Sequence, residues 1–192
     1  MRQQLEAVRQ GERRQTEALQ EQADRRLAVL DRETDARLKA LNRRYRQEEQ
    51  LLTDRFDDAQ NGQERALNRQ QDAEVRGVER SFEARRRAIQ QARGLDENSK
   101  QQALDNLRDE QDQALGLIRD RYASQLRDLQ RANRDQRQAQ QDRLDDQKAR
   151  EEAGIKATNE ARKNAIKKQS QEEIGLIKDR ASALADAIKG EG

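Results

Sequence analysis

Residues 24–89 decide the fold: cut into blocks of eleven they read DRRLAVLDRET, DARLKALNRRY, RQEEQLLTDRF, DDAQNGQERAL, NRQQDAEVRGV and ERSFEARRRAI. One column runs down the last position of these blocks, and its members are Thr34, Tyr45, Phe56, Leu67, Val78 and Ile89. A second column, which includes Leu38, lies four residues after the first, and a third, which includes Leu41, lies seven residues after it. Three turns of an α-helix take about eleven residues, so the columns form one stripe along a helix.

The same stripe continues in phase over the second half of the chain. The chain has 35 residues of Leu, Ile, Val, Phe, Tyr and Met, and 28 of them lie in the three columns. The others are Val29, Leu51, Val75, Leu95, Leu117, Ile174 and Leu176. This repeat of about 3.67 residues per turn predicts an all-α chain that forms a long right-handed coiled coil.

We expect the stripe to form the seam between the helices of an oligomer, because an isolated helix would leave it in water. The predicted seam consists of Leu19, Leu27, Leu30, Leu38, Leu41, Tyr45, Leu52, Phe56, Leu67, Val78, Phe82, Ile89, Leu104, Leu107, Leu115, Ile118, Tyr122, Leu126, Leu129, Leu144, Ile155, Ile166, Ile177, Leu184 and Ile188.

Composition argues against a compact core and against common enzyme chemistry. Charged residues make up 41% of the chain and aromatic residues 2%, so there is little apolar surface to bury. There is no His and no Cys. Without them the usual nucleophile–base pairs and zinc sites cannot be built. We expect no enzyme, no catalytic, cofactor-binding or metal-binding residues, and no cofactor.

Charge and hydropathy also bear on partners and location. The chain has 40 basic and 38 acidic residues, and the basic run at residues 85–87 stands alone, so we expect no specific nucleic-acid partner. Every apolar run is far shorter than a membrane-crossing helix needs, which predicts no membrane span. The N-terminus lacks a signal-peptide apolar region. We expect a virion or cytoplasmic location rather than secretion.

One junction interrupts the stripe at Gly94, Leu95 and Asp96. Glycine favours the left-handed conformation that ends helices, and Asp96 can cap a new helix. We therefore predict a Leu-rich helical rod over 1–93, a junction over 94–96, a second rod over 97–147 and a thinner Ile/Ala/Lys tail over 148–192.

Two arrangements of these rods are open. An antiparallel two-helix hairpin would lay the Leu-rich residues 19–56 beside the poorer 134–171. It would also lay 104–129 beside polar stripe positions, and these are Gln63, Gln71, Glu74 and Arg85. A parallel homo-oligomer, such as a trimer, matches each layer with itself. We therefore predict an extended rod with a break at 94–96, and keep the hairpin as the alternative.

The blocks LKALNRRYRQEEQLL, LGLIRDRYASQLRDLQ and IGLIKDRASALADAIK resemble coiled-coil segments of bacteriophage tail tape-measure proteins. The resemblance implies a rod inside a tail tube, whose helical length sets the tube length. This chain departs from that family in being short and in lacking the apolar segments and enzymatic domains of many members.

The predicted function is a non-enzymatic spacer or length-determining rod of a phage or phage-like particle. Its expected partners are itself and other virion or scaffold proteins. One alternative is a cytoplasmic coiled-coil scaffold or adaptor that binds partner helices. Another is a hydrophilic membrane-surface or stress-protection helix.

Overall fold

The computed structural model describes residues 1–191, which form two long helices. Helix α1 spans Arg2–Gln90, with 89 residues, and helix α2 spans Glu97–Gly190, with 94 residues. The prediction of an all-helical chain is confirmed, and residues 1–191 contain no strand. Abundant Ala, Leu, Arg, Gln, Glu and Lys favour this conformation, and no Pro interrupts it.

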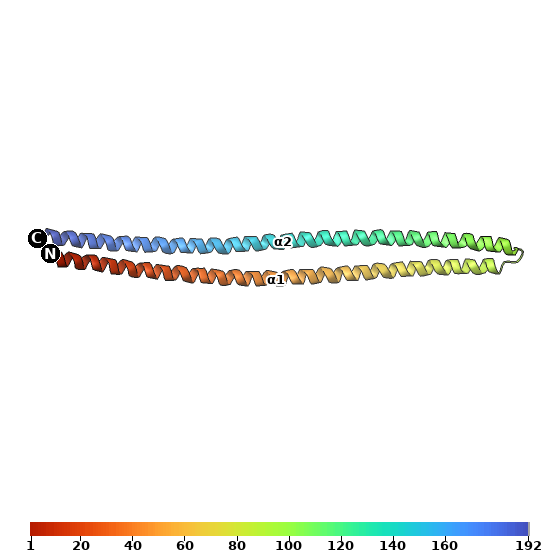
Figure 1. Cartoon of the computed structure of the whole chain (residues 1–192), viewed down its shortest axis with the longest axis horizontal. Helices are drawn as coiled ribbons and strands as arrows, with labels where there is room; N and C mark the ends of the chain where they lie inside the picture. Colours follow the sequence, from red (N-terminus) through yellow and green to blue (C-terminus); the bar gives the residue numbers. More distant parts are fainter. Residues whose placement is uncertain (192) are drawn as a thin grey trace. The chain divides into compact units, whose positions relative to one another are not determined.

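The chain divides into two compact units, and each contains a part of both helices. Unit 1 consists of Met1–Gln47 and Leu144–Gly192, and unit 2 of Glu48–Arg143. Within each unit, a segment of α1 lies beside a segment of α2 (Figure 1).

Unit 2 is a helical hairpin. The second half of α1 leads into a turn, and the first half of α2 returns alongside it (Figure 1). Side chains far apart in sequence meet across the pair: Arg85 forms an ion pair with Glu110 at 2.9 Å. Arg137 likewise lies 3.5 Å from Asp57. The predicted extended rod is therefore wrong, and the antiparallel two-helix alternative is confirmed in this unit.

Polar stripe positions look mismatched in a hairpin when the sequence alone is considered, but in unit 2 Gln63, Glu74 and Arg85 have polar partners across the seam. Gln63 accepts a hydrogen bond from Asn133 at 3.1 Å. Glu74 accepts one from Tyr122 at 2.9 Å. A polar layer that finds its hydrogen-bond partner costs far less than an unpaired one, so matching apolar density alone predicts the wrong topology.

The turn between the helices occupies residues 91–96 and is fixed by a few local contacts. Gly94 has a φ of +95°, which suits glycine because it has no Cβ. The N–H of Ser99 donates to Asp96 Oδ1 at 2.8 Å, so Asp96 caps the first turn of α2. Lys100 Nζ donates to the carbonyl of Gln90 at 3.3 Å and ties the start of α2 to the end of α1.

Unit 1 is an antiparallel pair of helical segments, with the start of α1 beside the end of α2 (Figure 1). Asn159 donates to Asp31 at 3.2 Å, and Lys163 forms an ion pair with the same carboxylate at 3.2 Å. Together they hold the pKa of Asp31 below its usual value of 3.8, with the hydrogen bond from Asn159 as the largest cause.

The core of each unit is a narrow seam. The buried apolar residues are Ala23, Leu41 and Tyr45 in unit 1 and Phe82, Leu107 and Tyr122 in unit 2. Fully burying one large apolar side chain contributes about 1.5–3 kcal/mol. Because buried side chains are so few, the polar contacts across the seam carry much of the specificity of pairing.

Candidate functional site

The seam between the paired helical segments of each unit is the candidate functional site, because the hollows on the units do not resemble a substrate site. They are open grooves; most are lined largely by polar and charged side chains, and one in unit 1 is lined by Val29, Leu30 and Ile166 beside two arginines. Another, in unit 1, is bordered by Arg9, Glu12, Arg13, Thr16 and Glu17. Sites for small molecules are normally concave and apolar with a few placed polar groups. All of these grooves are open, so none of them encloses a ligand in that way.

An arginine–tyrosine clamp closes the seam of unit 1. The Tyr45 side chain is 2% exposed, and its hydroxyl donates to Glu151 Oε1 at 3.0 Å. Arg44 donates to the other oxygen of the same carboxylate. The guanidinium carbon of Arg44 also lies 5.1 Å from the centre of the Tyr45 ring. The carboxylate on α2 therefore binds two adjacent side chains of α1.

A second clamp with the same components closes the seam of unit 2, with the helices in exchanged roles. Tyr122 on α2 is 5% exposed and donates to Glu74 Oε1 on α1 at 2.9 Å. Arg121 pairs with Glu74 Oε2, and its guanidinium carbon lies 5.3 Å from the Tyr122 ring centre. Each clamp joins an Arg-Tyr dipeptide on one helix to a single Glu on the other.

Burial raises the pKa of both Tyr45 and Tyr122 above the usual value of 10.0, and the hydrogen bond to a carboxylate raises it further. Each neighbouring arginine opposes the shift. The phenols therefore stay protonated as donors, since a phenolate would face a carboxylate at hydrogen-bond distance.

The third aromatic contact, in unit 2, has no hydroxyl. The guanidinium carbon of Arg85 lies 5.1 Å from the centre of the Phe82 ring. Arg85 also pairs with Glu110 across the seam. Arg86, next to it, donates to Gln111 at 3.4 Å and pairs with Glu83 at 2.9 Å. The basic run at 85–87 is thus engaged in interhelical and local pairs near the turn.

The sequence reasoning missed the clamps, although a signal was present. Tyr122 follows Tyr45 by seven blocks of eleven. Glu151 follows Glu74 by the same seven blocks, so the spacing from the Tyr to the Glu of one helix is equal in α1 and α2. Matching Arg-Tyr dipeptides with Glu residues at this repeat would have indicated an antiparallel pairing.

The predicted oligomer seam lies mostly between α1 and α2 of one chain. In unit 1, Leu41 and Tyr45 are buried, Leu184 is 55% exposed, and nine members are half-buried: Leu19, Leu27, Leu30, Leu38, Leu144, Ile155, Ile166, Ile177 and Ile188. In unit 2, Phe82, Leu107 and Tyr122 are buried, and the rest are half-buried: Leu52, Phe56, Leu67, Val78, Ile89, Leu104, Leu115, Ile118, Leu126 and Leu129.

The other predicted positions lie outside the seam or at its edge. At the junction, Gly94 and Asp96 shape the turn, while Leu95 is 46% exposed. Of the apolar residues that fall outside the stripe, Val75 and Ile174 are half-buried. The remaining ones, Val29, Leu51, Leu117 and Leu176, are exposed.

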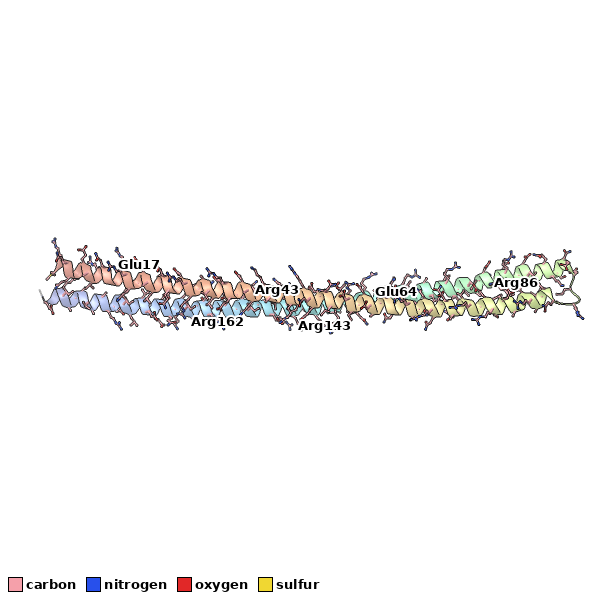
Figure 2. The ribbon with its side chains drawn as sticks, turned by 90° about the horizontal axis from the view of Figure 1, so that it is seen from below. Glu17, Arg43, Glu64, Arg86, Arg143 and Arg162 are labelled. Carbon is pink, nitrogen blue, oxygen red and sulfur yellow. The ribbon has the colours of Figure 1, made fainter. Side chains whose placement is uncertain are left out.

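The outer surface of each unit is charged. Side chains such as Glu17 and Arg162 in unit 1 and Arg143 in unit 2 are exposed (Figure 2). Within residues 1–191, no group of three or more His, Cys, Asp or Glu is placed to hold a metal ion. In the same range, neither helix has a stretch apolar enough to cross a membrane.

Comparison of the chain with protein families, with characterised proteins and with solved structures finds no match.

Proposed function

We propose that this chain is a non-enzymatic structural element, a helical spacer or scaffold whose charged outer faces contact partner proteins. The observation that carries the proposal is the pair of arginine–tyrosine clamps. In these clamps, tyrosine, arginine and glutamate side chains join α1 to α2 within each unit. Such contacts fix register, which a spacer requires and an isolated helix lacks.

Between the two structural roles predicted from the sequence, we place the scaffold that binds partner helices first. In unit 2 the residues of α2 run back beside α1, so the two helices share one length instead of adding their lengths. Exposed leucines on the outside of that unit, Leu51 at 65% and Leu117 at 72%, are available for partner helices.

A length-setting role in a phage-like particle is a second form of the same proposal, and it rests on the resemblance of the three quoted blocks to tape-measure segments. In this form too, α1 and α2 act as a paired strut. A parallel homo-oligomer would need the same apolar stripe that already packs between α1 and α2 of one chain. It stays a prediction, which a measurement of the mass in solution tests.

The experiment is a matched deletion of eleven residues from each helix of unit 2, removing 60–70 and 126–136. Because one full repeat is lost on both sides, the stripe and both clamps keep their phase. We expect a folded chain whose paired helices are shorter by about 16 Å, at 1.5 Å per residue. In the native assembly, tagged and imaged by electron microscopy, the spacing set by this chain should decrease by that amount.

The control removes nine residues from each helix, 60–68 and 128–136, which is about two and a half turns and moves the following stripe to the opposite face of the helix. We expect this variant to lose helicity and not to assemble. If the chain with the eleven-residue deletion forms an assembly of unchanged dimensions, the spacer role is ruled out.

A further inference from the structure

The apolar stripe keeps its phase through the turn, although a hairpin does not require it. Ile89, near the end of α1, and Lys100, near the start of α2, are eleven residues apart and occupy the same column. Both side chains are half-buried. A loop that only reverses the chain could have any of several lengths. Six residues, 91–96, are the number that keeps both helices in one eleven-residue frame.

The turn itself contains one residue whose conformation excludes a helix. Gly94 has a φ of +95°, whereas every non-glycine residue over 1–191 has a negative φ. The segment 91–96 contains no Pro. If Gly94 changed to a helical φ, residues 91–96 could join α1 and α2 into one helix with an unbroken stripe.

In that open form a chain could not pair α1 with its own α2, so both seams would be free for a second copy. The clamps are suited to this exchange, because each copy carries two Arg-Tyr dipeptides and two Glu partners. The residue numbers of Tyr45 and Glu151 sum to 196, as do those of Tyr122 and Glu74. One antiparallel register between two open chains therefore satisfies every clamp.

We propose that this chain exchanges helices with a second copy of itself: residues 91–96 become helical, and the two open chains pair antiparallel. Tyr122 of one copy then donates to Glu74 of the second copy, and Arg85 pairs with Glu110 of the second copy. Exchange of identical elements is a low-cost route to dimers, because the contacts are those of the closed chain. The closed and exchanged forms differ mainly in the turn.

The test is Gly94→Ala. A Cβ at this position meets nothing within 4 Å, so any effect arises from the backbone conformation. Alanine disfavours the left-handed φ of the closed turn and favours the helical φ of the open form. Each chain that opens should contribute a factor of about ten, so we expect the dimerisation constant to rise roughly a hundredfold. Analytical ultracentrifugation across a concentration series measures it.

The matched control is Gly77→Ala, within α1 of unit 2, where a Cβ also meets nothing within 4 Å. This change favours the helix equally in both forms, so the dimerisation constant should stay the same. A second variant adds Gly-Ser-Gly-Ser after Gly94. It relaxes the closed turn and breaks the continuous phase, so the dimer should become weaker than that of the unmodified chain.

The pairing within the dimer is read by cross-linking, which is simple because the native chain has no cysteine. Tagged Arg85→Cys and untagged Glu110→Cys chains, each also carrying Gly94→Ala, are mixed, refolded together and treated with a short bismaleimide. A tagged–untagged product supports helix exchange. A Gly94→Ala chain that stays monomeric overturns the proposal, and so does a dimer that gives no such product.

Discussion

Replacing Leu107 with alanine tests whether the seam within one chain stabilises the fold. Leu107 is 4% exposed, although it lies in a seam only two helices wide. The substitution removes three carbons at about 0.8 kcal/mol each, so we expect the free energy of unfolding to fall by about 2.4 kcal/mol. The cavity term should be small, because a narrow seam can collapse or admit water.

The control is Leu117→Ala, a change of the same residue type in the same helix and unit. Leu117 is 72% exposed, so its loss should change the free energy of unfolding by no more than about 0.5 kcal/mol. Helix propensity changes equally in the two variants and cancels in the comparison. Urea unfolding, followed by circular dichroism at 222 nm, measures both. Equal losses at the two positions would refute the seam described above.

Three further predictions concern the clamps, the turn and the seam of unit 1. Burial and a carboxylate neighbour raise the pKa of Tyr45 and Tyr122, so the stability that the two phenols contribute is complete below pH 10 and is lost as the pH rises through their folded pKa. Spectrophotometric titration should show both phenols ionising at a higher pH in the folded chain than in urea, and ionisation at the same pH would contradict the clamps. The hydrogen bonds from Ser99 lower the pKa of Asp96, so the stability that this carboxylate contributes is present above its ordinary pKa and is lost as the pH falls through its pKa in the folded chain. In acid unfolding, Asp96→Asn should remove that part of the pH dependence of stability, and an unchanged profile would argue against the cap. The Ser170 hydroxyl is buried without a hydrogen-bond partner, so Ser170→Ala should raise the free energy of unfolding by about 1 kcal/mol in urea, and a loss of stability would show that the hydroxyl is satisfied.

The sequence predicts the helices and the face they bury. Leu41, Phe82 and Leu107 are recognisable because a narrow stripe repeated over many turns leaves little choice of which side is covered. The turn is also visible in the sequence, since Gly94 and Asp96 carry the chemistry of a helix end and a helix start.

The direction of pairing could not be predicted from apolar density. Both parallel and antiparallel arrangements bury the same stripe, and the choice depends on which polar side chains meet. Glu74 looks like a defect along α1, yet it is the acceptor for Tyr122 and Arg121. Asp31 is likewise the partner of Asn159. Cross-helix polar pairing requires the register, which apolar density does not supply and which only the repeated spacing of the Arg-Tyr dipeptides and their Glu partners indicates in the sequence.

The most direct test of the account is a distance between positions 57 and 137, within unit 2. Asp57 and Arg137 lie 3.5 Å apart in the hairpin, although they are far apart in sequence and belong to different helices. Spin labels are placed on Asp57→Cys and Arg137→Cys of one chain, which is diluted into unlabelled chains at a concentration where the chain is monomeric. The two labels should lie within roughly 25 Å of each other, because packed helix axes are about 8–10 Å apart. An extended chain would place them about 120 Å apart, at 1.5 Å per residue. Absence of the short distance under these conditions would contradict pairing of α1 and α2 within one chain.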